Sequence, residues 1–205
     1  TAKFADPSGY GRILRGENNQ VLGVVEHKDA SQEQLLISEI NTGTYIFQGK
    51  LLFAYLTQIT PHNAQAEYYL PDVLPLMIRD GHKVAGFVLD DAAESMGIND
   101  RIQLAEAEAI LRDRICRHWQ EKGVTIIDPQ TTWIEWDCEI GQDTVIYPGS
   151  FIQKNTIIGQ NCVIGPNCRF YKADIKDGVR LENVVISGRT VGPEEKIDPF
   201  SFLSE

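Results

Sequence analysis

The sequence is poor in cysteine: its 205 residues contain four, and no two of them form a Cys-x-x-Cys pair. A disulfide scaffold of this size would need more cysteines, and a typical structural zinc site would need such pairs, so we expect neither. No apolar run approaches the roughly 20 residues that a membrane helix requires. The N-terminus has neither the apolar stretch of a signal peptide nor a starting Met, which predicts that the chain is a piece of a longer protein.

Positive charge is scarce as well. The chain has 19 Lys and Arg against 29 Asp and Glu, which gives a formal net charge of −10. A surface of this sign repels phosphate backbones, and this argues against nucleic-acid binding. With 42% hydrophobic and 23% charged residues, the composition is that of a globular protein with a buried core.

Before residue 123, β-rich runs alternate with helical apolar patterns. Strands are predicted at 10–14, 21–26, 40–47 and 84–89, and helices at 51–59, 68–78 and 99–122. The first two strands are separated by a turn, the last strand is expected to be buried, and Gly123 would end the long helix. Such alternation predicts an α/β domain.

From residue 123 onward the hydrophobic period changes to six. Large apolar residues recur without a gap at Ile134, Ile140, Ile146, Ile152, Ile158, Ile164 and Phe170. Small residues form a second register of the same period at Cys138, Thr144, Ser150, Thr156, Cys162 and Cys168. A helix cannot repeat at six and a flat strand repeats at two, so this period is typical of a hexapeptide β-helix. We expect three hexads per triangular coil, with the large residues inside and the small residues at the bends.

The register breaks between Tyr171 and Asn183, a segment predicted to be a loop or an irregular coil. It resumes in a shifted phase at Val185, Val191, Ile197 and Leu203. The sequence then stops at Glu205 without a capping helix, although an open solenoid end exposes apolar core and unpaired backbone. This is a second indication that the sequence is part of a longer chain.

Several polar segments of the first half are candidates for ligand contacts. Residues 6–12, Asp-Pro-Ser-Gly-Tyr-Gly-Arg, could bring backbone close to a ligand or simply form a hairpin turn. Residues 26–29 place four polar groups at a strand end, which is either a ligand contact or a solvated edge. Asn41 could bind a sugar hydroxyl or an N-acetyl group, because its amide both donates and accepts. Asn99 opens the long helix and could simply be its N-cap.

Taken together and in this order, the segments resemble one family, the bacterial bifunctional N-acetylglucosamine-1-phosphate uridyltransferase / glucosamine-1-phosphate N-acetyltransferase. The matching motifs are DPSGYGRILR, VVEHKDAS, EINTGTYIF, NAQAEYYLPD, GINDRIQLAEAE, the hexapeptide repeats and IDPFSFL. The resemblance implies an α/β chain in which residues 1–98 are the C-terminal part of a Rossmann-like uridyltransferase domain. Residues 99–122 would be a linker helix, and residues 123–205 the first coils of a left-handed parallel β-helix acetyltransferase domain.

The resemblance also implies roles for single residues. The positions that match contacts to UDP-N-acetylglucosamine are Gly11, Glu26, Asn41 and Asn99. Asn99 also matches a position that gives an oxygen to Mg²⁺, which is plausible because substrate phosphates supply most of the other ligands. Thr42 and Gly43 resemble supporting residues, while the Glu67–Tyr69 segment matches a region near the sugar pocket without an assigned role.

The implied activity has two steps. Acetyl is transferred from acetyl-CoA to glucosamine-1-phosphate, and uridylyl is then transferred from UTP to N-acetylglucosamine-1-phosphate with release of pyrophosphate. The family is cytoplasmic and forms homotrimers through the β-helix, which predicts a trimeric parent protein and leaves open whether this chain alone trimerises.

The chain departs from the family pattern at both ends. The glycine-rich loop, the Lys that binds the UTP phosphates and the main Mg²⁺-ligating Asp have no counterpart here, nor do the acetyltransferase residues expected after Leu203. Asp198 stands where the family more often has Gly. Because uridylyl transfer depends on positioning phosphate and metal, we expect no catalytic residue in this chain and no activity from it alone.

Two other interpretations remain open. The first is a different sugar-phosphate nucleotidyltransferase with a hexapeptide-repeat domain, such as an ADP-glucose or GDP-mannose pyrophosphorylase. The EINTG and NAQAEYYLPD motifs favour the uridyltransferase pattern over it. The second is a non-catalytic scaffold that binds a nucleotide sugar.

Overall fold

The structure, a computed structural model, describes residues 1–204. The chain divides into two compact units, Thr1–Gly97 and Ile98–Glu205, and each has its own buried core. Within the described residues, no helix combines the length and the apolar character needed to cross a bilayer.

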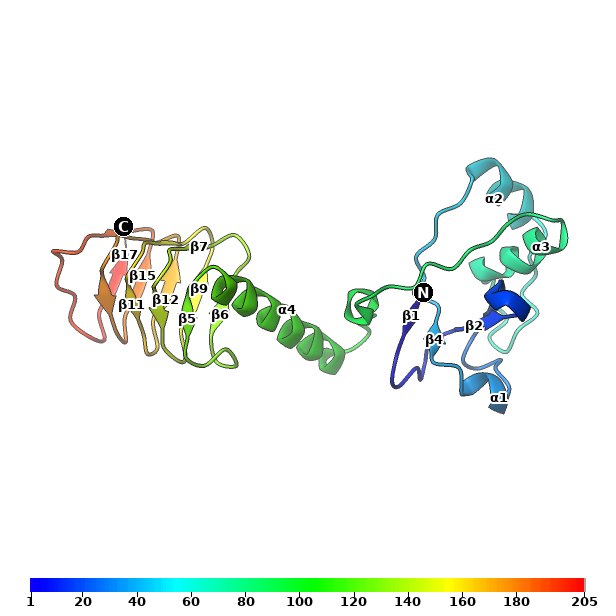
Figure 1. The fold of residues 1–205 in the computed structure, drawn as a ribbon, viewed down its shortest axis with the longest axis horizontal. Helices are drawn as coiled ribbons and strands as arrows, with labels where there is room; N and C mark the ends of the chain where they lie inside the picture. The colour runs from blue at the N-terminus through cyan, green and yellow to red at the C-terminus, as the bar shows by residue number, and fades with distance from the viewer. Residues whose placement is uncertain (205) are drawn as a thin grey trace. The chain divides into compact units, whose positions relative to one another are not determined.

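The first unit is built on a four-stranded antiparallel sheet with the order β1-β4-β2-β3 (Figure 1). Its strands are β1 Ala2–Lys3, β2 Arg12–Arg15, β3 Val21–Val25 and β4 Glu39–Ile40. The two strands predicted first form a hairpin, β2 and β3, connected by the short helix η1 Glu17–Asn19. Arg12 pairs with both Val25 and Ile40, which places β2 inside the sheet.

Short helices follow the strands of this unit. They are α1 Gln32–Leu35, α2 Gly49–Leu56, η2 Leu70–Asp72, α3 Val73–Arg79 and η3 Ala92–Ser95. The buried core consists of Tyr55 on α2 and of Val73, Leu74 and Met77 on α3. The helix predicted at 68–78 is divided, because Pro71 lies in the first turn of the 3-10 helix η2 that precedes α3.

Two strand predictions need correction. Residues 84–89 form no strand, and Phe87 is 78% exposed. Among the described residues no strand pairs with this segment, and its backbone bonds to Thr1 instead: Leu89 N–H donates to the Thr1 carbonyl (2.9 Å) and the Thr1 amino group to the Phe87 carbonyl (2.7 Å). The strand predicted at 40–47 ends at Ile40. There the Asn41 Oδ1 accepts from the Gly43 N–H (3.1 Å), and Gly43 turns the chain with a φ of 73°.

The second unit is a parallel β-solenoid preceded by the long helix α4 Arg101–Glu121 (Figure 1). Its three sheets have the orders β16-β13-β10-β7, β14-β11-β8-β5 and β17-β15-β12-β9-β6. The strands are β5 Thr125–Ile126, β6 Trp133–Ile134, β7 Glu139–Ile140, β8 Val145–Ile146, β9 Phe151–Gln153, β10 Ile157–Ile158, β11 Val163–Ile164, β12 Arg169–Tyr171, β13 Asp174–Ile175, β14 Arg180–Leu181, β15 Val185–Ser187, β16 Thr190–Val191 and β17 Phe202–Ser204. From β5 to β16, successive strands go to the three sheets in turn, as the hexads predict, and β17 then pairs with β15.

The two predicted registers are confirmed. The seven large residues from Ile134 to Phe170 are at most 7% exposed, and the six small residues at most 3%. Inward residues stack from coil to coil, so that Ile152 pairs with both Ile134 and Phe170. The small residues also satisfy backbone groups at the bends: Thr144 Oγ1 donates to the Gly159 carbonyl (2.8 Å).

The segment 171–183, predicted to be irregular, is a regular part of the solenoid. It forms β13 and β14, which pair in parallel with β10 and β11. The inward residues here are Ile175 and Leu181, and the next is Ile186 rather than the predicted Val185. Three steps are shortened from six residues to five, the last of them from Ile186 to Val191 (175 − 170 = 5, 186 − 181 = 5 and 191 − 186 = 5). A bend can lose one residue while the inward side chain keeps its place, and a search at period six misses this.

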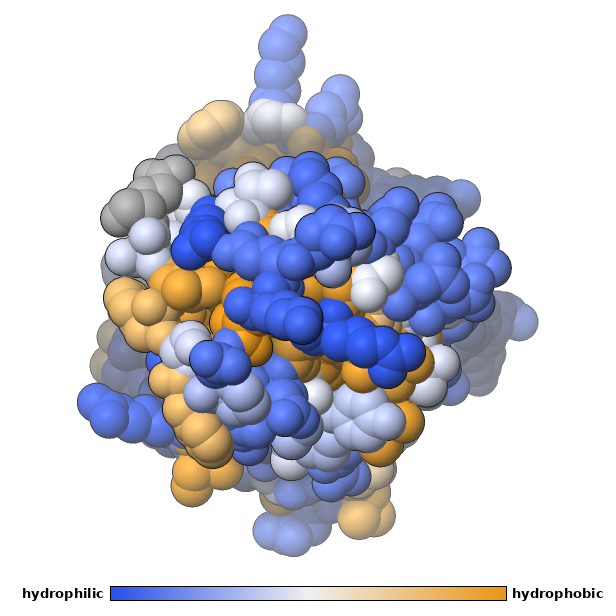
Figure 2. All heavy atoms as spheres, turned by 90° about the vertical axis from the view of Figure 1, so that its left-hand side faces the viewer, coloured by the Kyte–Doolittle hydropathy of each residue, from blue (hydrophilic) through white to orange (hydrophobic). Residues whose placement is uncertain are grey.

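Apolar residues continue to the last coils. Ile197 and Leu203 are partly buried and pack against the solenoid core. Figure 2 shows the molecule from this end of the solenoid. Apolar residues are visible in the middle of the face, and polar residues lie across them.

Helix α4 is attached to the solenoid by its C-terminal half. Ile115, Cys116 and Trp119 belong to the same buried cluster as the inward residues of the coils. On the outside, the Arg112 guanidinium lies 5.0 Å from the centre of the Trp133 ring, which stacks on Phe151 at 6.4 Å. The helix and the coils therefore share one core.

Candidate functional site

A glycine turn, residues 6–11, leads into β2 in the first unit. Gly9 has a φ of 82°, a conformation that glycine adopts without steric cost. The Tyr10 hydroxyl accepts a hydrogen bond from the Gly97 N–H (3.2 Å), which ties the turn to the end of the unit. The turn therefore presents Gly11 in a defined position just before β2.

Gly11, Glu26 and Asn41 meet at this end of the hairpin. A β-carbon placed on Gly11 would lie 2.8 Å from Glu26 Oε1, so the carboxylate sits directly against the Gly11 backbone. The Asn41 N–H donates to the Gly11 carbonyl (2.8 Å). Three of the four residues predicted to contact a nucleotide sugar thus come together, and their role in binding stays a prediction.

The Glu26 carboxyl has an unusual electrostatic environment. Burial raises its pKa, and the neighbouring carboxylates of Asp29 and Asp72 raise it further, while a hydrogen bond from the Asn41 amide opposes them. Burial also raises the pKa of Asp72, with a smaller contribution from Asp29. A carboxylate in such surroundings gains from hydroxyl donors, and sugar hydroxyls are donors of this kind.

The Asn41 side chain is held by its own loop. Its Oδ1 accepts from the Tyr45 hydroxyl (2.7 Å) and from the Gly43 N–H (3.1 Å). Burial raises the pKa of Tyr45 to about 12, so this hydroxyl remains a donor at neutral pH. Thr42 and Gly43 support the site in this sense, because they form the turn that orients the amide.

A cavity of about 800 Å³ lies beside this loop. Asn41, Thr42 and Tyr45 line it together with apolar residues such as Val24 and Met77. Gly11 and Glu26 do not line the cavity. Asn41 therefore connects the Gly11–Glu26 surface with the larger hollow.

The segment predicted to lie near a sugar pocket is anchored close to Glu26. Asp29 Oδ1 accepts from the Ala64 N–H (2.8 Å), and Asn63 Oδ1 accepts from the Glu67 N–H (3.2 Å). The side chains of Glu67 and Tyr68 are exposed. The anchoring places the segment near Asp29 and gives Glu67 no defined contact to Glu26.

One partly buried ion pair was not predicted from the sequence. Arg15 donates from Nε and Nη2 to the two carboxylate oxygens of Glu39 (2.7 and 2.6 Å), and the Thr1 hydroxyl donates to Glu39 Oε1 (2.6 Å). These hydrogen bonds, chiefly those of Arg15, lower the pKa of Glu39. Opposite charges on neighbouring strands were the available signal, but the register that brings them together is a tertiary property.

Asn99, the fourth predicted residue, lies in the second unit. It is exposed, and its backbone N–H donates to Gln103 Oε1 (2.6 Å). The N-cap of α4 is Asp100, whose Oδ1 accepts from the N–H groups of Ile102 (2.9 Å) and Gln103 (2.8 Å). The side chain of Asn99 is therefore not used for capping. Across residues 1–204, no three His, Cys, Asp or Glu side chains gather as a metal site would require.

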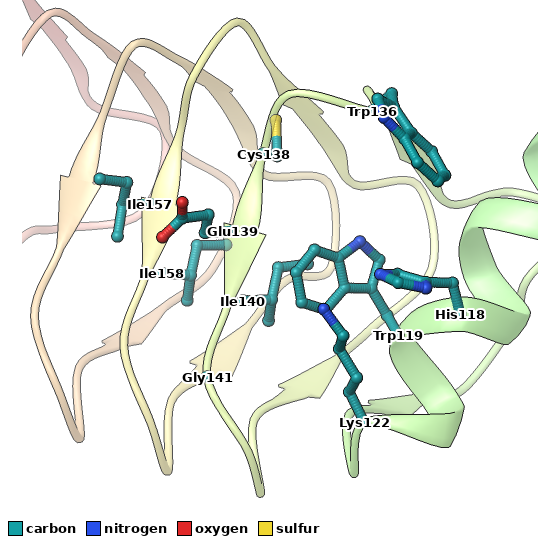
Figure 3. A pocket seen from close by; sticks show the side chains of 10 residues that line it. All are labelled: His118, Trp119, Lys122, Trp136, Cys138, Glu139, Ile140, Gly141, Ile157 and Ile158. Atoms are coloured by element: carbon teal, nitrogen blue, oxygen red, sulfur yellow. The ribbon is translucent and has the colours of Figure 1, made fainter.

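The second unit has a hollow of its own, of about 670 Å³, at the C-terminal end of α4 (Figure 3). His118 and Trp119 of the helix, and Lys122 just after it, face Glu139 and Ile157 of the coils across it. The Lys122 ammonium lies 4.8 Å from the centre of the Trp119 ring.

Comparison with known proteins gives two results. Residues 137–172 match the family described as bacterial transferase hexapeptide (six repeats). The chain is also 46% identical over 203 residues to the bifunctional protein GlmU of Shouchella clausii, and 45% identical over 205 residues to that of Exiguobacterium sibiricum. The bifunctional protein GlmU of Halalkalibacterium halodurans is 44% identical over 203 residues.

These alignments cover 99%, 100% and 99% of the chain and 45%, 46% and 45% of the three relatives. The chain thus spans about half the length of the curated relatives that it matches. The resemblance inferred from the sequence motifs is confirmed: over its whole length the chain is similar to bifunctional proteins of this kind, and the hexapeptide match agrees with the solenoid.

Proposed function

We propose that the whole protein makes UDP-N-acetylglucosamine by two successive transfers. Acetyl-CoA acetylates glucosamine-1-phosphate, and UTP then transfers uridylyl to N-acetylglucosamine-1-phosphate with release of pyrophosphate. The observation that carries the proposal is the meeting of Gly11, Glu26 and Asn41 within a chain about 45% identical to bifunctional GlmU proteins. Thr1–Gly97 would hold the nucleotide sugar, and the solenoid would belong to the acetyl-transfer half.

Each of the three residues offers the nucleotide sugar a different kind of contact. Gly11 allows close approach of the backbone, since it has no β-carbon. Glu26 offers a desolvated carboxylate to sugar hydroxyls. This role would explain why a charged side chain lies at a position where burial raises its pKa. Asn41 would present the remaining N–H of its amide, because its oxygen already accepts from Tyr45 and Gly43 and its amide also donates to Glu26.

Mg²⁺ is the metal that we propose for uridylyl transfer. Asn99 would provide one amide oxygen, and no hydrogen bond from its side chain to another residue of 1–204 competes for that atom. Mg²⁺ bound with substrate phosphates keeps several waters and needs few protein ligands, so this donor set fits. When bound, the metal would neutralise phosphate charge during transfer.

The remaining proposals concern assembly and location. The solenoid would mediate a homotrimer, as in the family that the motifs indicate. We place the protein in the cytoplasm, and the four cysteines fit a reducing compartment because all of them are free and buried.

Titration of the 205-residue chain with UDP-N-acetylglucosamine tests the first unit's role. We expect weak binding, with a Kd on the order of 1 mM, and weaker binding still for Asn41→Ala. ADP-glucose and GDP-mannose serve as matched competitors. Tighter binding of either would reassign the substrate, and absence of any binding at several times that concentration would refute the nucleotide-sugar site.

A further inference from the structure

Among the described residues, Arg12 has the largest fully buried side chain, and it forms no ion pair. Its side chain is on β2, only 1% of the residue is exposed, and its Nε has no hydrogen-bond partner. Within the described chain, no carboxylate forms an ion pair with it. A buried guanidinium without a carboxylate is costly, so an arrangement that keeps it requires an explanation.

The remaining guanidinium nitrogens point to the glycine turn and to one imidazole. Arg12 Nη1 donates to the Tyr10 carbonyl, and Arg12 Nη2 lies 3.4 Å from His27 Nδ1. The Gly9 N–H donates to the same His27 Nδ1 (3.2 Å). Two donors therefore converge on one ring nitrogen, which must act as an acceptor.

This geometry fixes the state of His27. With Nδ1 accepting, the ring is neutral and carries its proton on Nε2. A proton on Nδ1 would face the Gly9 N–H and a buried guanidinium, and both contacts would be lost. The groups around the ring are Arg12 on β2, Asp6 in the turn, and Glu26 and Lys28 beside it in the chain. The pKa of Asp6 is lowered mainly by its hydrogen bonds from Ser8, and the Arg12 charge contributes a little.

We infer that Arg12 and neutral His27 are positioning residues that hold the glycine turn in its binding shape. Gly9 is held by His27, Tyr10 by Arg12 and Gly11 by Asn41, so three consecutive residues are fixed. The inference rests on the proposed function for its ligand but not for its geometry.

Two variants of His27 distinguish a positioning role from a general role in folding. His27→Asn places an amide oxygen where Nδ1 was and keeps the acceptor, but it cannot be protonated. His27→Leu keeps apolar volume and removes the acceptor. Because His27 is only half-buried, both variants are expected to fold, which far-ultraviolet circular dichroism checks.

The first measurement needs no ligand. Nitrogen–proton correlation spectra of the imidazoles should show His27 with its proton on Nε2 at about pH 7.5. The protection factor of the Gly9 amide against hydrogen exchange should be at least about tenfold lower in His27→Leu than in the native chain at that pH, and close to the native value in His27→Asn. A proton on Nδ1, or equal Gly9 protection in His27→Leu and the native chain, overturns the inference.

The second measurement uses UDP-N-acetylglucosamine as the probe. At about pH 7.5, the His27→Asn Kd should match the native value, because the amide oxygen keeps the acceptor. His27→Leu should bind about tenfold more weakly at the same pH. Equal affinity of His27→Leu and the native chain contradicts the inference.

A negative result in one of the two measurements does not imply a negative result in the other. If the native chain binds no UDP-N-acetylglucosamine, the proposed function falls, while the imidazole spectra still decide whether the positioning pair exists. Arg12→Lys tests whether the two guanidinium nitrogens are both needed, because a lysine cannot reach the Tyr10 carbonyl and His27 together. It should weaken binding about tenfold. If this variant does not fold, the histidine variants carry the decision.

Discussion

The Gly11 backbone and the Glu26 carboxylate are so close that a methyl group does not fit between them. A β-carbon on Gly11 would lie 2.8 Å from Glu26 Oε1 and 3.0 Å from Val24 Cγ1. The Glu26 carboxylate can therefore take this position only because Gly11 has no side chain.

Gly11→Ala should consequently displace the Glu26 carboxylate. We expect UDP-N-acetylglucosamine to bind at least about tenfold more weakly and the first unit to lose about 1–2 kcal/mol, as overpacking usually costs. Calorimetric titration and hydrogen exchange of β2 and β3 measure the two effects. Gly49→Ala is the matched control, because a β-carbon there meets no atom within 4 Å. Equal affinity in both variants would contradict the assignment of Gly11.

Glu26→Gln should stabilise the first unit while it weakens binding. The Glu26 pKa is raised above its ordinary value of 4.5, chiefly by burial. A carboxyl of this kind contributes stability below its ordinary pKa and loses that contribution as pH rises through the raised value. At pH 7 the charge is thus a penalty, which glutamine removes.

The exchange protection of β2 and β3 should therefore be higher in Glu26→Gln than in the native chain at about pH 7 and converge with it near pH 4. The exposed Glu17 gives the control variant Glu17→Gln, which should show no such convergence. A lower protection in Glu26→Gln at neutral pH would show that the carboxylate stabilises the fold.

Ile152→Asp should disrupt the solenoid. Ile152 is fully buried between Ile134 and Phe170, so the substitution places an unpaired carboxylate in the core and should cost at least about 3 kcal/mol. Ile157→Asp is the control, because Ile157 is 46% exposed. All three tryptophans lie in the second unit, so their fluorescence in urea reports on it alone. A midpoint that falls equally in both variants would refute the inward register.

The four cysteines should resist thiol reagents in the folded chain. Burial raises the pKa of Cys116 and Cys138 to about 11 and also raises the pKa of Cys162 and Cys168. At about pH 8 the thiols are therefore neutral and unreactive. Mass spectrometry after exposure to iodoacetamide should show no adduct without urea and four adducts in denaturing urea. Rapid labelling of one cysteine in the native chain would show that its coil opens.

The solenoid was predictable because its determinants are local. One residue per hexad decides which side chain is inside, and an unbroken series such as Ile146, Ile152 and Ile158 makes that choice visible in the sequence. The five-residue steps near Ile175 were not visible, because a shortened bend changes the spacing without changing the chemistry.

The first unit was less predictable, because its strands are short and depend on distant partners. Residues 84–89 look like a buried strand by composition, yet no neighbouring strand pairs with them. The meeting of Gly11, Glu26 and Asn41 followed from a resemblance and not from periodicity. The partnership of Arg12 with His27 had no sequence signal, since it depends on how a turn folds back on a hairpin.

The parallel ladders that join the coils also determine how the second unit would respond to force. Their hydrogen bonds run from coil to coil, so tension along the stacking direction loads only the few bonds between one coil and the next. Coils should therefore detach from the solenoid one at a time. A force–extension experiment would then record a series of small, evenly spaced unfolding events instead of one large event.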